Sequence, residues 1–366
     1  MPIPSLFCIG LPGPELDDST RRLLDRGVGG VILFARNVRS PEQVARLCHD
    51  LKAYAGRPLL ITIDQEGGRV ARLREGFTAI PAMRDLGATG DGALGREVGR
   101  VLGRELKAVG IDLNFAPVMD VDSNPANPVI GTRSLARDPE TVARLGVALA
   151  QGMQEVGVAA CAKHFPGHGD TDTDSHLALP RLGHGMDRLK AVELLPFRAA
   201  IAGGVASIMS AHVVFEALDS GVPGTLSKKV MTDLLAGEMG FGGLRISDCM
   251  EMKAIANGQG WCGVVGASVK ALQAGVDLVL ISHGHDLAHA AMDAAEKALN
   301  AGELAHARVA DAEARLKVVL ECYAVKAQAA PDLSCLNGAA HREVAARISV
   351  GNVNKEKDPT VAIGGM

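Results

Sequence analysis

The loop at residues 163–176, KHFPGHGDTDTDSH, concentrates side chains that can exchange protons. It holds one Lys, three His and three Asp among fourteen residues, although the whole chain has only 11 His. Pro166 and the glycines at positions 167 and 169 prevent a helix from running through it. This composition indicates either proton-transfer chemistry or a solvated surface loop with incidental charges.

Within this loop, Asp174 stands two residues before His176, close enough for its carboxylate to hold an imidazole N–H. Such a pair fixes the tautomer of the histidine and raises its basicity, so the histidine can serve as acid and then base near neutral pH. A zinc site built from His164, His168 and His176 is the alternative. Pro and Gly separate the first two of these histidines and exclude a helical ligand pair, and the chain has no H-E-x-x-H motif. The sequence therefore predicts no metal and no other cofactor.

Three further segments place acids or bases near turns. Asp64 precedes a Gly-Gly turn and then Arg72 in ITIDQEGGRVARL. Arg133 follows a glycine in NPVIGTRS, and Asp248 directly follows an apolar run in RISD. An Arg in a Gly-rich loop, such as Arg133, usually lies at the surface. The acid and bases of the first segment can hydrogen-bond a polyol. They can also pair with one another, and an Asp after a strand commonly begins a helix.

The composition excludes several classes of function. The 366 residues are 47% hydrophobic and 22% charged, with a formal net charge of -4 and a pI near 6.3. No long run of like charge predicts binding to nucleic acid or anionic lipid. The apolar runs are too short, or too broken by charge, to span a bilayer. We expect a globular monomer that binds a small molecule and neither nucleic acid nor a membrane.

The cysteines and the N-terminus indicate a cytoplasmic protein. The seven cysteines are odd in number, widely scattered and without C-x-x-C or zinc-finger spacing, which is typical of reduced thiols. The first residues, MPIPSLFCIG, have neither a basic region nor a cleavage-site pattern, so we expect no signal peptide.

The elements that must position these side chains are eight short apolar runs that alternate with helical patterns. Their continuous apolar character is typical of strands covered on both faces, as in a parallel sheet. The predicted strands are residues 5–10, 30–36, 58–64, 112–120, 158–164, 206–212, 244–248 and 276–282.

The sequence also indicates where the helices between these strands begin and end. Ser40, with Gln43 at the reciprocal capping position, and Asp138 each precede a proline and an acidic residue, which predicts two helix starts. Gly56, Gly110 and Gly157 stand where helices are expected to end.

Eight strand–helix units in this length predict a single-domain (β/α)8 barrel of the TIM type over residues 1–330. A doubly wound open sheet is the alternative, but GLPGPELD after the first run is a poor phosphate-binding turn. In a barrel the chemistry lies at the C-terminal strand ends. Polar residues follow six of the predicted strands there, which predicts a polar pocket: Asp64, Asp120, Asp122, Lys163, His164, His212, Asp248 and His283.

The pattern weakens after about residue 325. Residues 331–366 are expected to comprise a linker, a short helix at 338–348 and a disordered polar tail.

The order of five motifs resembles glycoside hydrolase family 3, and within it the bacterial β-N-acetylglucosaminidases of the NagZ type. The motifs are D-Q-E-G-G-R-V, N-F-A-P-V-x-D, I-G-x-R-S, K-H-F-P-G-H-G-x4-D-S-H and I-S-D. The resemblance extends from about residue 5 to about residue 325, and the long fourth motif is highly specific. Any one of the other motifs would be weak evidence by itself.

The resemblance implies a retaining exo-β-N-acetylglucosaminidase that releases terminal N-acetylglucosamine from muropeptide fragments of the cell wall, as in peptidoglycan recycling. It implies that Asp248 is the nucleophile, that His176 is the acid/base and that Asp174 orients it. It also implies a set of residues that hold the terminal sugar: Asp64, Arg72, Arg133, Lys163 and His164.

Two departures and three alternatives qualify this interpretation. Cys249 stands where the family often has a second Asp, and from the length of the chain we expect no added C-terminal domain like that of the larger β-glucosidases. The alternatives are a family-3 glycosidase for another sugar, such as glucose or xylose, a sugar-binding barrel without activity, and a metal-dependent barrel hydrolase.

Overall fold

A computed structural model describes residues 2–324 and 331–348, and it contains a closed barrel of eight parallel strands. The barrel order is β1-β12-β11-β9-β7-β6-β3-β2. Its strands are β1 Phe7–Gly10, β2 Gly30–Leu33, β3 Leu60–Ile63, β6 Leu113–Asn114, β7 Ala159–Phe165, β9 Ser207–Ser210, β11 Leu244–Cys249 and β12 Leu278–Ile281. The predicted (β/α)8 barrel is therefore confirmed, and the open doubly wound sheet is wrong.

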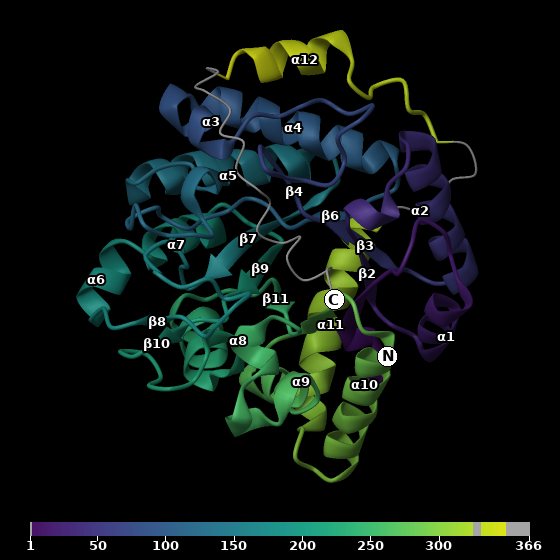
Figure 1. Ribbon diagram of the computed structural model, residues 1–366, viewed down its shortest axis with the longest axis vertical. Coiled ribbons are helices and arrows are strands. Elements are labelled where there is room, and N and C mark those ends of the chain that lie inside the picture. The colour runs from purple at the N-terminus through teal and green to yellow at the C-terminus, as the bar shows by residue number, and fades with distance from the viewer. Residues whose placement is uncertain (1, 325–330, 349–366) are drawn as a thin grey trace.

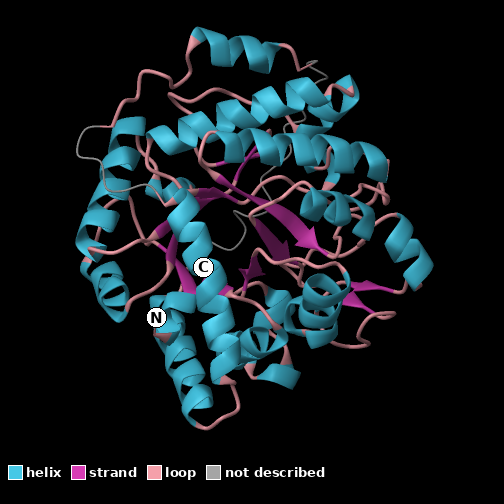
Figure 2. Cartoon of the chain, turned by 180° about the vertical axis from the view of Figure 1, so that it is seen from behind, coloured by secondary structure: helices cyan, strands magenta, loops and turns pink. Residues whose placement is uncertain are grey.

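Helices surround this barrel on all sides, as Figures 1 and 2 show. The main ones are α1 Asp18–Arg26, α2 Pro41–Ala55, α4 Gly92–Ala108, α5 Pro139–Glu155, α7 Leu194–Ala202, the π-helix Lys229–Glu238, α9 Gly263–Ala274, α10 His285–Asn300 and α11 His306–Tyr323. Short helices α3 Met83–Thr89, α6 Met186–Ala191 and α8 Lys253–Ala256 lie between them. In Figure 1 α3, α4 and α5 lie in the upper half of the molecule and α9 and α10 in the lower half.

The strands are buried on both faces, as the continuous apolar runs predict. In β3, Ile61 and Ile63 pack in the cluster between strands and helices, while Leu60 packs in a second cluster with Cys161 and Leu278 of other strands. Side chains alternate across a strand, so one run supplies both clusters. This two-sided burial stabilises the barrel whose C-terminal edge carries the polar residues.

Six of the eight predicted strands are longer than the strands of the structure, and the overshoots beyond the C-terminal ends of β2 and β6 have a visible cause. After β2, residues Ala35–Asn37 form a 3-10 turn, because the Asn37 side chain accepts the N–H of Phe34 at 2.8 Å. The strand predicted at 112–120 pairs as β6 over only Leu113–Asn114, and the chain beyond it keeps a single bridge from Val118 to Lys163.

The predicted helix caps are present in the structure, with one difference. Ser40 Oγ accepts the N–H of Gln43 at 3.2 Å, and Asp138 accepts the N–H of Thr141 at 2.9 Å. The Gln43 side chain, however, accepts the N–H of Arg39 at 2.8 Å and not that of Ser40. The three predicted C-terminal glycines all have positive φ, which a residue with a Cβ rarely adopts: Gly56 62°, Gly110 88° and Gly157 85°.

Beyond the barrel, helix α12 (Ala339–Ala346) lies outermost, beside α4 (Figure 1). His341 Nδ1 lies 2.9 Å from Oε1 of Glu105, which belongs to α4. The expected polar tail from residue 349, together with residues 325–330, lies outside the described residues.

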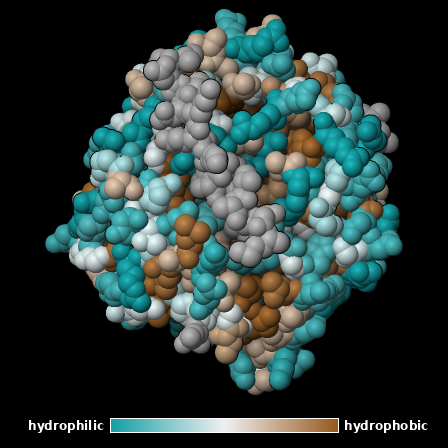
Figure 3. Space-filling view, viewed as in Figure 1, coloured by the Kyte–Doolittle hydropathy of each residue, from teal (hydrophilic) through white to brown (hydrophobic). Residues whose placement is uncertain are grey.

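The surface seen in Figure 3 is mostly hydrophilic, with scattered apolar patches. The exposed large apolar side chains are Tyr54, Leu177, Leu287 and Val318, which lie on different elements. Among the described residues, none of the helices has the length and apolar character needed to cross a membrane.

Candidate active site

A pocket lies at the C-terminal ends of the strands. Its apolar floor is formed by Ile32, Phe115, Met209 and Leu280 from inside the barrel. Its polar lining comprises Asp64, Arg133, Lys163, His164, His168, Ser175, His176, Asp248, Ser282 and His283. The barrel therefore gathers polar groups from sequence segments more than 200 residues apart into one concave site.

The structure brings together six of the eight candidate residues in the pocket lining: Asp64, Arg133, Lys163, His164, His176 and Asp248. The other two, Arg72 and Asp174, stand behind the lining. Arg72 Nη2 lies 3.5 Å from Oδ2 of Asp64, and Asp174 Oδ1 lies 2.8 Å from Nδ1 of His176. These two side chains therefore act on the pocket through a neighbour.

Asp248 is the one partly exposed residue of β11, and its side chain faces the pocket. Its Oδ1 accepts the N–H of Cys249 at 2.7 Å. Burial raises the pKa of Asp248, but the imidazoles of His212, His164 and His176 outweigh this effect and hold the pKa below its usual value. Asp248 is therefore ionised at neutral pH, which is the state in which a carboxylate can attack carbon.

Cys249, the departure beside Asp248, is a buried thiol. Burial raises its pKa to about 12, and its Sγ lies 3.7 Å from Oε2 of Glu251. A neutral thiol therefore stands next to Asp248 where the family often has a carboxylate. This side chain adds no negative charge that would disfavour ionisation of Asp248.

Asp174 and His176 form the pair that their spacing predicts. Asp174 Oδ1 accepts the backbone N–H of His176 at 2.8 Å and lies 2.8 Å from its Nδ1. Burial raises the pKa of Asp174, but these two hydrogen bonds outweigh burial and hold the pKa below its usual value. The carboxylate is therefore charged. Because Nδ1 is held by Asp174, the other ring nitrogen of His176 is left to face the pocket, which this residue lines.

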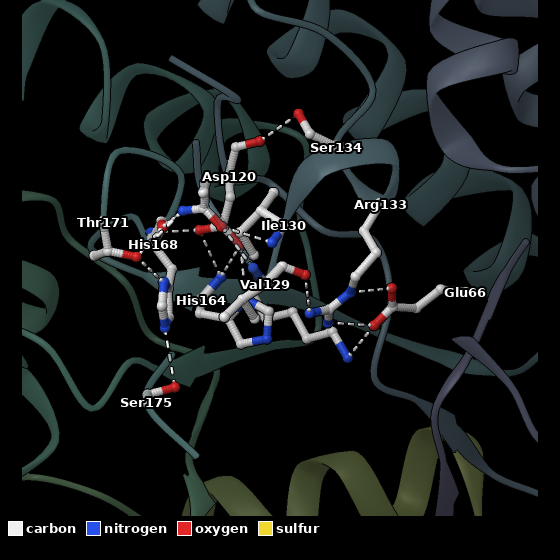
Figure 4. Close-up of polar contacts among 12 residues, drawn as sticks. Glu66, Asp120, Val129, Ile130, Arg133, Ser134, His164, His168, Thr171 and Ser175 are labelled. Carbon is white, nitrogen blue, oxygen red and sulfur yellow. Dashed lines mark hydrogen bonds and ion pairs between the residues drawn. The ribbon is translucent and has the colours of Figure 1, made fainter. Parts of the chain in front are cut away.

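A buried network of charges lies at the pocket wall next to Asp64. Lys163 Nζ lies 2.7 Å from Oδ1 of Asp64 and 2.7 Å from Oε1 of Glu66. Arg133 binds the same Glu66 carboxylate in bidentate fashion, at 2.9 Å and 2.8 Å (Figure 4). Bidentate pairs of this kind fix a guanidinium group in one orientation.

The charges in this network keep one another ionised. Burial would raise the pKa of Glu66, but Arg133 and Lys163 hold it far below its usual value. Burial lowers the pKa of Lys163, but Asp64 and Glu66 raise it overall. The pocket therefore presents fixed donors and acceptors, which suits a ligand rich in hydroxyl groups.

Glu66 was not among the candidate residues, although it lies in the D-Q-E-G-G-R-V motif. Its partners are 67 and 97 positions away in the chain, and no local pattern identifies them. The signal that the sequence does contain is an acidic residue beside a Gly-Gly turn after a strand.

Glu66→Gln preserves the shape of the side chain but leaves buried Arg133 without its carboxylate partner and leaves Lys163 with Asp64 alone. We expect the free energy of unfolding to fall by about 3 kcal/mol and KM to rise, measured by urea unfolding and steady-state kinetics. Glu155→Gln is the control, because Glu155 pairs with Arg96 and Arg100 at the exposed surface and should change both quantities little. Equal effects of the two substitutions would contradict the role given to the buried network.

A second layer of hydrogen bonds orients His164 in β7 and His168 in the loop that follows it. Asp120 Oδ2 lies 2.6 Å from Nδ1 of His164, and Asp120 Oδ1 accepts the N–H of His168 at 2.6 Å (Figure 4). Burial raises the pKa of Asp120, but the two histidines lower it overall. The sequence placed Asp120 at a strand end but did not identify it as the anchor of His164.

Three of the predicted strand-end residues do not line the pocket. Asp120 lies beneath His164, and His212 is buried with Nδ1 2.8 Å from Oγ1 of Thr225. Asp122 is directed to Arg84, at 2.7 Å. The expectation that all these residues share one pocket is wrong for these three. The chain after β6 is irregular and turns Asp122 away, whereas the ring of His212 is taken up by Thr225 and the carbonyl oxygen of Cys249.

The histidines proposed as zinc ligands already have protein partners. Nδ1 of His164 faces Asp120 and Nδ1 of His176 faces Asp174, while both ring nitrogens of His168 are hydrogen-bonded. His168 thus has no ring nitrogen free for a metal, which argues against a zinc site that includes it.

Among the described residues, Cys249, Glu251 and His283 are the group whose ligand atoms all lie within 4.8 Å of one another. The carboxylate of Glu251 already accepts the backbone N–H groups of Ser282, His283 and Gly284, at 2.6, 2.8 and 2.7 Å. Through these three hydrogen bonds the carboxylate of Glu251 holds the loop after β12 in place. His283 in turn stacks on Phe34 with ring centroids 5.5 Å apart.

The family model for the glycosyl hydrolase family 3 N-terminal domain matches residues 13–319 of the chain. Over 289 residues the chain is 43% identical to a β-hexosaminidase of Thiobacillus denitrificans, covering 76% of this chain and 79% of that protein. It is 44% identical to a β-hexosaminidase of Neisseria meningitidis serogroup C over 281 residues, covering 74% and 76%.

Solved structures are similar over most of the chain. A family 3 β-N-acetylglucosaminidase from Paenibacillus matches with a TM-score of 0.91 and 44% identity, covering 94% of this chain and 67% of that one. Native NagZ from Neisseria gonorrhoeae matches with a TM-score of 0.79 and 34% identity, covering 94% and 96%.

Proposed function

The chain belongs to glycosyl hydrolase family 3, and from this membership we propose that it is a retaining exo-β-N-acetylglucosaminidase. The observation that carries the proposal is the meeting of Asp248 and the Asp174–His176 pair in one pocket, beside the charge network of Asp64. Relatives named β-hexosaminidase and β-N-acetylglucosaminidase support the choice of sugar. The chain is in any case a glycoside hydrolase.

In the first step of the proposed reaction, a carboxylate oxygen of Asp248 forms a bond to the anomeric carbon. The bond from that carbon to the leaving oxygen breaks, and this oxygen takes a proton from His176. The products are a sugar ester on Asp248 and the released aglycone. A nucleophilic carboxylate and a proton donor at the leaving oxygen are the two groups that retaining hydrolysis needs.

In the second step His176 takes a proton from water, and the water oxygen attacks the anomeric carbon. The bond to Asp248 breaks and returns the carboxylate. An imidazole can fill both roles because it titrates near neutrality, whereas a carboxylic acid has to be buried before it can donate at that pH. Asp174 holds the ring so that the same nitrogen serves both steps.

Asp64, Arg133, Lys163 and His164 are proposed to hold the terminal N-acetylglucosamine, with Arg72 supporting Asp64. The supporting observation is that all four line the pocket and that each is held by a neighbour: Arg133 and Lys163 by Glu66, His164 by Asp120, and Asp64 by Lys163. Their orientation is therefore fixed before the sugar arrives, which lowers the entropic cost of binding.

We place the natural substrates among muropeptide fragments of the cell wall and the enzyme in the cytoplasm, in peptidoglycan recycling. The seven cysteines, which are all free thiols, support a reducing compartment. We further propose that residues 1–330 form the catalytic domain, with residues 331–366 outside it. The enzyme is proposed to act as a monomer, without a metal or cofactor.

The substrate proposal predicts a large preference between two matched nitrophenyl substrates. We expect kcat/KM for the N-acetyl-β-glucosaminide to exceed that for the β-glucoside by about a hundredfold or more, because buried polar groups left without a partner penalise the wrong sugar. Initial rates with the two substrates at equal concentration measure this ratio. Equal or inverted rates would overturn the choice of sugar while leaving the family unchanged.

A further inference from the structure

Ser175 lies between Asp174 and His176 and is anchored at both its side chain and its backbone. Its Oγ lies 3.0 Å from Nε2 of His168, and its carbonyl oxygen accepts the N–H of Ala254 at 3.2 Å. Figure 4 shows the contact between Ser175 and the ring of His168. Ser175 is 1% exposed, whereas Asp172 and Leu177 of the same loop are exposed.

His168, the side-chain partner, belongs to the rigid base of the loop. Its backbone N–H donates to Asp120 at 2.6 Å, and its carbonyl oxygen accepts from Nδ2 of Asn127 at 2.9 Å. Its Nδ1 lies 2.7 Å from Oγ1 of Thr171. Because His168 is held at these three points, it is a fixed point for Ser175.

The imidazole of His168 is neutral at physiological pH. Burial and the neighbouring His164 lower its pKa to about 4, well below the usual value for histidine. A neutral ring has one donor and one acceptor nitrogen, and the hydroxyls of Thr171 and Ser175 can take either role. The contact is therefore satisfied at any pH above about 5.

The backbone anchor leads to the strand that carries Asp248. Ala254 lies in α8, which follows directly after β11. The two contacts of Ser175 thus link His168, at the base of the loop, to α8, which follows the strand that carries Asp248. Because Asp174 and His176 flank Ser175, both are carried to a fixed position relative to Asp248.

We propose that Ser175 is a positioning residue: its hydroxyl, held by His168, fixes the Asp174–His176 pair over the pocket. The inference rests on the proposed function, in which His176 moves the proton. Ser175 acts through His176 and does not contact the reacting atoms. Losing its side-chain contact should therefore slow the steps that His176 catalyses.

The first test is Ser175→Ala, which removes the hydroxyl and preserves the loop. We expect kcat/KM for a β-linked dimer of N-acetylglucosamine to fall about fivefold to thirtyfold, the effect of one buried hydrogen bond left unmade. The loss should be smaller with a nitrophenyl leaving group, which needs little protonation. Thr173→Ala is the matched control, because the Thr173 hydroxyl donates to the exposed Asp172 in the same loop.

The second test is a double-mutant cycle with His176→Ala, measured on the nitrophenyl substrate. If Ser175 acts through His176, Ser175→Ala slows the wild-type enzyme but has almost no further effect in the His176→Ala background. Additive losses would show a merely structural role and overturn the inference. If His176→Ala lowers the rate and Ser175→Ala does not, the inference alone is wrong, whereas a His176→Ala enzyme of unchanged rate overturns the proposed function too.

A pair of substitutions at His168 separates its two contacts. The amide of Gln can replace Nε2 and reach Ser175, whereas the amide of Asn can replace Nδ1 and reach only Thr171. We expect His168→Gln to be at least about threefold more active than His168→Asn on the dimer, since one buried hydrogen bond differs between them. The reverse order would assign the effect to Thr171 and contradict the positioning role of Ser175.

Discussion

Asp248→Ala is expected to abolish turnover, with a loss of about five orders of magnitude in kcat, the scale at which removal of a nucleophile acts. No other carboxylate among the lining residues lies at the end of β11, and the second carboxylate in the lining, Asp64, is bound to Lys163. Both steps of the reaction fail, since neither the sugar ester nor its hydrolysis can occur without this carboxylate.

The measurement combines kinetics with intact-mass spectrometry. A fluorinated N-acetylglucosamine analogue with a good leaving group should label the wild-type enzyme once, and peptide mapping should place the label on Asp248. Asp248→Ala should take no label. Asp233→Ala, which removes an exposed acid from the π-helix, is the control for the loss of a carboxylate as such. A label on another residue would refute the assignment of the nucleophile.

The second large effect is expected for His176→Ala, and its size depends on the leaving group. With a sugar aglycone the rate should fall by about three orders of magnitude, in the middle of the range for a general acid. With nitrophenolate the first step should suffer little, because this group leaves without a proton. Hydrolysis of the ester then becomes limiting, since water has lost its base, and the sugar should accumulate on Asp248.

Rapid-quench mass spectrometry of His176→Ala during turnover of the nitrophenyl substrate tests this directly. A burst of nitrophenolate followed by a slow steady rate is the expected kinetic pattern. Asp174→Ala should show a milder version of it, because the imidazole remains but loses its partner at Nδ1. An undiminished rate of His176→Ala on both leaving groups would exclude it as the acid/base.

Much of the fold follows from local sequence. The eight apolar runs became eight barrel strands because a strand covered on both sides has to be apolar throughout, and this requirement is visible in a few consecutive residues. Ser40 and Asp138 were readable as helix starts for the same reason, since a cap binds the chain within three residues. The strand predicted to residue 120 was too long, because pairing depends on the neighbouring strand.

The sequence by itself determined which chemistry-bearing residues the chain has and that a barrel would bring their strand ends to one edge. Asp174 and His176 were paired correctly because they are two residues apart and their contact is local. Only the tertiary structure decided which side chains line the pocket and which stand behind it. Arg72 contacts Asp64, Glu66 binds Lys163, and Asp122 turns away toward Arg84.

The contact of Ser175 with His168 is likewise decided by the tertiary structure and not by the local sequence. The position of Ser175 between two candidate residues was plain in the sequence, but its bond to His168 depends on how an irregular loop folds back on its own base. Periodicity carries information only where hydrogen bonds repeat along the chain, as in helices and strands. In a Gly- and Pro-rich loop, each hydrogen bond is made once, to a partner that packing selects, and so these contacts are decided by the folded structure.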